Sequence, residues 1–126
     1  MLDPDLINFV RHSLRSVWAL EVLLFIRRHS PEPVGYGTIV RELRATPALV
    51  RRIVEQLVAE HLVVPEGAES VRFRASTTSL ERMCDLVDAA SRDRPIALRD
   101  AIIGNPDAKL KNFSDAFRFT DKEGEK

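Results

Sequence analysis

The chain has 126 residues, a length that suits one domain with a hydrophobic core of limited size. Its 19 basic and 19 acidic residues cancel, which argues against a protein held on nucleic acid by overall charge and leaves that role to a local basic patch. Cys84 is the only cysteine, so no internal disulfide and no cysteine-based zinc site can form. An acidic start and an apolar stretch at 17–26, too short to span a bilayer, predict a cytoplasmic protein.

The first predicted element is one long helix from Asp3 to His29. Asp3 is a typical helix cap, Pro4 fits the first turn, and apolar residues then recur every three or four positions. Around residues 17–26 this helix is apolar on nearly every side, so every side must be covered. A monomer of this size is poorly able to provide that cover, and we therefore expect a homodimer. The interface residues expected from this helix are Val17, Trp18, Leu24 and Phe25.

Two shorter helices and a hairpin are predicted next. The loop "SPEPVGYG" leads into a short helix over 36–45, and Thr46-Pro47 repeats the cap-and-proline start for a third helix that runs to about His61. Residues 61–64 and 71–76 alternate as strands do and flank a turn at Gly67. In the second strand Arg72 and Arg74 are expected on one face.

The remainder of the chain is predicted to be helical. The capping box Thr78-x-x-Glu81 starts a fourth helix, "SRDRP" interrupts it, and "IALRDAII" continues it. A last amphipathic helix is expected over 106–119, followed by a polar, disordered tail at 120–126. We expect the 106–119 helix to dock within the dimer, the alternative being a groove on another protein. The further interface residues expected here are Met83, Val87, Phe113 and Phe117.

This order of elements resembles a winged helix-turn-helix domain. The residues that carry the resemblance are "YGTIVRELRATPALVRRIVEQLVAEHLVV" and "VRFRAS", within 34–76. They are similar to the recognition core of the MarR and PadR groups of bacterial transcriptional regulators, where T/S-P-x-x-V-x-R-x-V-x-x-L followed by G-L-V is common. The resemblance implies one domain over 1–119, mainly α with a small β-hairpin wing, in which 3–29 and 78–119 are flanking helices for dimerisation.

The sequence departs from the pattern of these regulators in two ways. His61 stands where they usually have glycine, so the end of the third helix needs a termination other than the usual left-handed glycine. Glu66 and Glu69 stand at a wing tip that is often basic in those groups. Because phosphate repels carboxylates, the acidic tip argues against insertion of the wing into a minor groove.

The resemblance implies that the third helix enters the major groove of DNA, where arginine donates two hydrogen bonds to guanine. Arg52 is expected to contact a base, and Arg51 a base or the backbone. Alternatively, Glu55 forms surface ion pairs with both arginines, three and four residues away. Phosphate contacts are expected at the N-terminus of the helix and from the wing. The complete set of expected DNA-binding residues is Arg44, Thr46, Arg51, Arg52, Arg72 and Arg74.

Two functions therefore remain open. The first is a homodimeric, sequence-specific DNA-binding transcriptional regulator without cofactor or catalytic activity. The alternative is a winged-helix adaptor that binds a protein of the transcription or replication machinery, which the zero net charge, the acidic wing tip and the aromatic 106–119 segment favour. The three histidines lie in separate predicted elements, so we expect no metal site, and Cys84 is expected to be a core residue. No catalytic motif predicts an enzyme.

Overall fold

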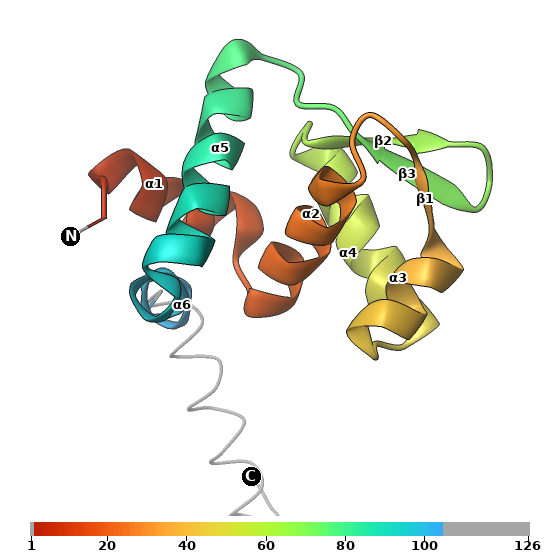
Figure 1. Cartoon of the computed structure of the whole chain (residues 1–126), viewed down its shortest axis with the longest axis horizontal. Coiled ribbons are helices and arrows are strands. Elements are labelled where there is room, and N and C mark those ends of the chain that lie inside the picture. Colours follow the sequence, from red (N-terminus) through yellow and green to blue (C-terminus); the bar gives the residue numbers. More distant parts are fainter. Residues whose placement is uncertain (1, 105–126) are drawn as a thin grey trace, which may run out of the picture.

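The computed structural model describes residues 2–104. Within this range the protein is mainly helical and has a small three-stranded antiparallel sheet of order β1-β3-β2 (Figure 1). The elements in chain order are α1 (Pro4–Phe9), the π-helix η1 (Val10–Leu14), α2 (Val17–Arg28), β1 (Val34–Gly35), α3 (Tyr36–Leu43), α4 (Pro47–Ala59), β2 (Val63–Glu66), β3 (Ser70–Phe73), α5 (Thr78–Asp93) and α6 (Pro95–Ile103).

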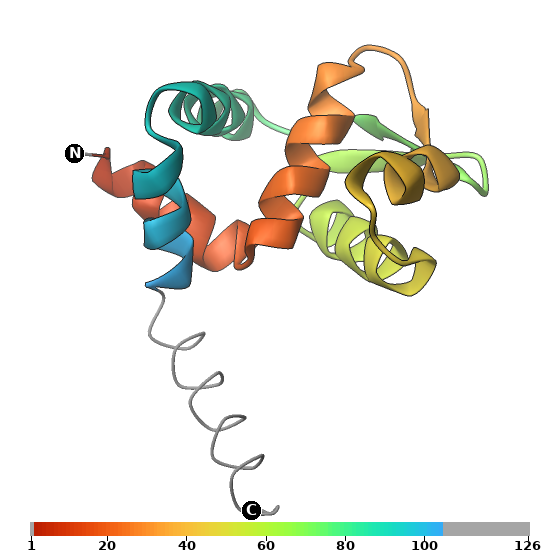
Figure 2. The same ribbon diagram turned by 60° about the horizontal axis from the view of Figure 1, so that its bottom comes forward.

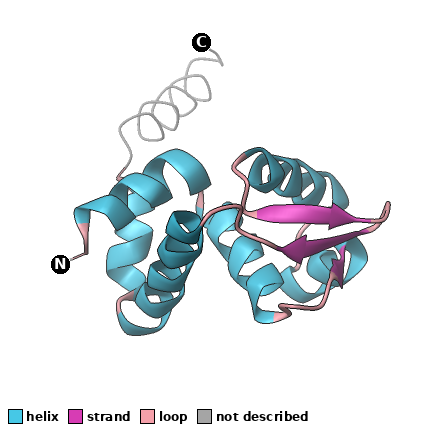
Figure 3. Cartoon of the chain, turned by 90° about the horizontal axis from the view of Figure 1, so that it is seen from above, coloured by secondary structure: helices cyan, strands magenta, loops and turns pink. Residues whose placement is uncertain are grey.

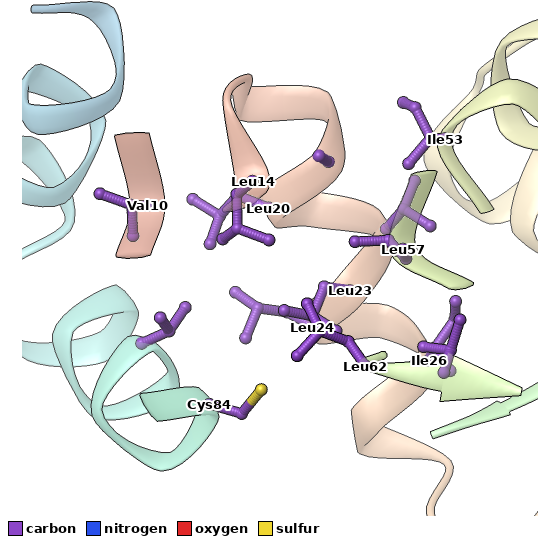
Figure 4. Close-up of a cluster of buried hydrophobic side chains, with 14 of the residues drawn as sticks. Val10, Leu14, Leu20, Leu23, Leu24, Ile26, Ile53, Leu57, Leu62 and Cys84 are labelled. Carbon is purple, nitrogen blue, oxygen red and sulfur yellow. The ribbon is translucent and has the colours of Figure 1, made fainter. Parts of the chain in front are cut away.

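The helix α2 forms the centre of the molecule. It packs on α3, α4 and β3 on one side and on η1 and α6 on the other (Figures 1 and 2). Its leucines meet Ile53 and Leu57 of α4 in one continuous hydrophobic core, which Cys84 of α5 also lines (Figure 4). The buried residues of α2 are Ala19, Leu20, Val22, Leu23, Leu24 and Ile26.

The expectation that α2 needs a partner subunit for its cover is therefore corrected, because the chain itself covers most of the helix. Leu24 and Val87, expected at a dimer interface, are 4% and 0% exposed and belong to the core of the chain. Val17, Phe25 and Met83 are partly buried against the same core. Trp18 remains 41% exposed.

The prediction of one long helix from Asp3 to His29 is wrong, because the helix breaks at Arg15 and Ser16. Arg15 has a left-handed backbone (φ 72°), and the Ser16 hydroxyl oxygen accepts a 3.1 Å hydrogen bond from the Ala19 N–H, which caps the start of α2. The break allows α1 and η1 to fold back and pack against α5 and α6. The helices α1, α5 and α6 gather at one end of the molecule and the sheet at the other (Figure 3).

The predicted pair of helices and the hairpin are confirmed. The Thr46 hydroxyl oxygen caps α4 by accepting a 3.2 Å hydrogen bond from the Leu49 N–H, and Pro47 is the first helical residue. In the hairpin, β2 and β3 pair from Val63 opposite Phe73 to Glu66 opposite Ser70, and Gly67 in the turn has φ 74°. The structure adds β1, which the sequence did not predict, on the free edge of β3.

The helices after the hairpin follow the prediction with one shift. Thr77, not Thr78, caps α5, since its hydroxyl oxygen accepts a 3.1 Å hydrogen bond from the Leu80 N–H. The predicted interruption falls at Arg94, and α6 then begins at Pro95. The 106–119 segment with Phe113 and Phe117, and the 120–126 tail, lie outside the described residues.

The end of α4 has the usual left-handed backbone but with histidine in place of glycine. His61 adopts the left-handed conformation (φ 65°) that the usual glycine would adopt. Its N–H donates to the Val58 carbonyl at 3.0 Å, and the Leu62 N–H donates to the Leu57 carbonyl at 3.1 Å. These bonds and the complete burial of Leu62 hold His61 in a conformation that costs a non-glycine residue about 1–2 kcal/mol.

We expect His61→Gly to raise the free energy of unfolding by about 0.5–1 kcal/mol, because relief of the backbone strain exceeds the entropy that glycine adds to the unfolded chain. Urea denaturation measures the change. His61→Ala is the matched control, since alanine removes the same exposed side chain and keeps the strain. A glycine variant no more stable than the alanine variant would contradict the prediction.

Candidate nucleic-acid interface

The turn between α3 and α4 presents two of the expected DNA-binding residues at one place. Arg44 ends α3 in a left-handed conformation (φ 55°), and Thr46 begins α4 two residues later. Both side chains are exposed, and Arg44 forms no ion pair with another residue of 2–104. Pro47 has no N–H, and the Leu49 and Val50 N–H groups already donate to Thr46, so the first turn of α4 offers a phosphate the Ala48 N–H in addition to the Arg44 guanidinium.

The adjacent arginines of α4 are both exposed but differ in their surroundings. The guanidinium carbon of Arg51 lies 5.3 Å from the ring centroid of Tyr36, a cation–π contact that holds the side chain against the start of α3. Arg52 has no hydrogen bond or ion pair to any residue of the described chain. Neither arginine pairs with Glu55 within 2–104, so the alternative of a local ion pair is not found.

The orientation of these arginines follows from the packing of α4. The face of α4 that carries its buried residues lies against α2 and α3. The exposed positions of the helix consequently lie on the opposite side, where no other described element covers them (Figure 2). The buried residues that decide this orientation are Val50, Ile53, Val54 and Leu57.

Arg72, which was expected to contact DNA, is engaged within the hairpin. Its Nε atom lies 2.8 Å from Oε1 of Glu66, on the neighbouring strand. Glu69 at the other side of the turn is exposed, and its carbonyl accepts a 2.8 Å hydrogen bond from the Tyr36 N–H. The tip of the hairpin therefore offers no unpaired cation to a phosphate.

Arg74 lies away from the other expected DNA-binding residues. It follows β3 and lines a groove with Val58 and His61 at the C-terminal end of α4. Since α4 has 13 residues and each advances the helix by 1.5 Å, its two ends are about 20 Å apart. Arg74 is thus separated from Arg44 and Thr46 by the length of the helix.

Two residues at this surface were missed from the sequence. Tyr36 contacts Arg51 only because α3 and α4 pack together, and no local pattern predicts that contact. Arg41 is exposed on α3, and its Nη2 atom donates to the Thr38 hydroxyl oxygen at 3.4 Å. The spacing of Arg41 and Arg44, three residues apart opposite the apolar face of a short helix, was the available signal.

Metal binding and membrane spanning are two further properties on which the described residues bear. Among residues 2–104, no three or more histidine, cysteine or acidic side chains come together in a group that could hold a metal ion. None of the helices in this range is long and apolar enough to cross a membrane.

Comparisons with protein-family models, curated proteins and solved structures find no match for this chain.

Cys84 is expected to be chemically inert in the folded protein. Its side chain is completely buried, and burial raises the pKa of the thiol to about 12 despite the opposing charge of Arg27. At neutral pH very little thiolate exists, and thiolate is the reactive form. Ellman's reagent should label the native protein far more slowly than the protein in denaturant. Equal rates in the two conditions would contradict burial and favour a redox-active thiol.

Proposed function

We infer that this protein is a transcriptional regulator that binds double-stranded DNA as a homodimer through a winged helix-turn-helix. The succession α2, α3, α4, β2, β3, α5 supports the inference, since it follows the order expected from the MarR and PadR resemblance. The observation that carries it is the exposed side of α4, where Arg52 is unpaired within 2–104 and Arg51 and Arg44 lie nearby. The proposal includes the cytoplasmic location that the sequence predicted.

In this proposal the residues of the α3–α4 unit have different roles. Arg52 donates to a base edge in the major groove, because its guanidinium has no competing partner in the described chain and suits guanine. Arg51, held on the Tyr36 ring, contacts the backbone beside the groove. Arg44 and the first turn of α4 take a phosphate. The Arg72–Glu66 pair stabilises the hairpin, and the wing contributes little to affinity.

The salt dependence of duplex binding tests this function. Phosphate contacts release counterions, so the affinity for a random duplex should fall steeply as the salt concentration rises. Fluorescence anisotropy with a labelled duplex measures the slope. Absence of binding to a random duplex at low salt would contradict the proposal.

Arg52→Ala should lower affinity for a selected, preferred duplex by about 1–3 kcal/mol and leave binding to random duplex nearly unchanged, because a base contact is lost. Arg82→Ala is the matched control: Arg82 is also exposed and without an ion pair in 2–104, but it lies on α5. Binding of both variants to both duplexes is measured at one salt concentration. Equal effects of the two substitutions would contradict a base contact by Arg52.

A protein-binding adaptor is the second candidate. The neutral net charge and the acidic hairpin tip, where Glu69 is exposed and Arg72 is neutralised by Glu66, favour it. The adaptor predicts no salt-dependent duplex binding, so the same titration separates the two candidates.

A further inference from the structure

The helix α6 exposes two large apolar side chains on one face. Ile96 and Ile103 are 74% and 51% exposed, and with Trp18 they are the large apolar residues of 2–104 that face solvent. They are seven residues apart, two helical turns, so they project on the same side of α6. Leu98, Ala101 and Ile102 form the opposite, buried side. Neither isoleucine is buried in the core that residues 2–104 form.

Two charged residues lie between the isoleucines on the same face. Arg99 and Asp100 are both exposed, and Asp100 forms no ion pair with any residue of the described chain. The order along this face is apolar, positive, negative, apolar, and its midpoint falls between Arg99 and Asp100. If a second α6 lay antiparallel across this midpoint, Ile96 would face Ile103 of the partner subunit and Arg99 would face Asp100 of the partner subunit. The face is therefore complementary to itself, as a twofold interface requires.

An apolar groove borders this face and enlarges it. Val17, Trp18, Glu21 and Leu43 line the groove together with Arg99, and its volume is about 290 Å³. The Nη2 atom of Arg99 lies 3.4 Å from Oε2 of Glu21, so α6 forms one wall of the groove. Since stable interfaces bury about 800 Å² per partner, a nine-residue helix alone falls short. The half-exposed Trp18 and the groove add apolar surface beside the outer face of α6.

We propose that this surface, formed by the outer face of α6 and the Trp18 groove, binds a second copy of the chain about a twofold axis between Arg99 and Asp100. The proposal rests on the homodimer of the proposed function and specifies its interface. Val17 and Trp18 remain interface residues as the sequence predicted, whereas Ile96 and Ile103 take the place of the buried Leu24 and Val87.

Charge reversal tests the pairing. Sedimentation equilibrium of the full chain at micromolar concentrations should detect a dimer. Asp100→Arg should raise its dissociation constant by roughly tenfold or more, because by symmetry like charges then meet twice. Arg99→Asp should act in the same direction and also loses the pair with Glu21, and the double variant Arg99→Asp/Asp100→Arg should dimerise more tightly than either single variant. Arg82→Asp on α5 is the matched control and should leave the dimer unchanged.

Three outcomes would overturn the proposal: a monomer at every concentration, single reversals without effect, or a double variant no tighter than the singles. A chain ending at Gly104 that dimerises when the full chain does not would show that residues 105–126 cover this face instead. Circular dichroism verifies that each variant is folded, which the exposure of both positions favours. The experiment uses no DNA, so it is independent of the duplex titration. A monomer that binds duplex would contradict this interface but not DNA binding. A dimer that binds no duplex would contradict DNA binding but not this interface.

Discussion

The burial of α2 between two groups of elements is the interaction on which the rest of the structure depends. Each of its buried leucines contributes about 1.5–3 kcal/mol on transfer from water, and they contact both groups at once. Arg27 adds a polar link near the end of α2. Its Nη1 atom lies 3.1 Å from Oδ2 of Asp88 on α5, and its guanidinium carbon lies 5.6 Å from the Phe73 ring centroid on β3. Burial opposes ionisation of Asp88, but Arg92 and Arg27 outweigh it and lower the pKa of that carboxyl below its usual value. Arg27 therefore connects α2 to both α5 and β3.

This packing also decides what the surface of α4 can do. Because α4 is anchored by its apolar face to α2, its arginines are directed outward without any interaction of their own. Arg51 and Arg52 differ in their surroundings. Arg51 is ordered on Tyr36 and loses less side-chain entropy on binding, whereas Arg52 keeps its full hydrogen-bonding capacity. In a protein of zero net charge, general attraction to the phosphate backbone is weak. Affinity for DNA would have to come from a few such placed contacts.

Strong local signals explain which elements the sequence could predict. Thr46-Pro47, Gly67 and the interruption before Pro95 are each sufficient to mark a boundary, and those boundaries are found. The break at Ser16 was missed because apolar periodicity continues on both sides of it, and β1 was missed because two residues form a strand only beside β3. The positions of the arginines on the outer face of α4 were predictable from helical geometry. Their partners were not, since Tyr36 for Arg51 and Glu66 for Arg72 come from other elements or other strands.

The structure changes which residues support a second subunit. The sequence predicted a second subunit because α2 is apolar on nearly every side. In the structure α4, α6 and η1 of the same chain pack on α2. Of the three large apolar side chains that are exposed in 2–104, Trp18 lies at the start of α2, and the other two belong to α6, whose sequence gave no strong signal because its charged residues interrupt the apolar run. Exposed isoleucines favour burial by any apolar surface, which by itself specifies no partner. The alternation of charge between them is specific, because an unrelated helix would have to present the reverse order, and an antiparallel copy of α6 does so by symmetry.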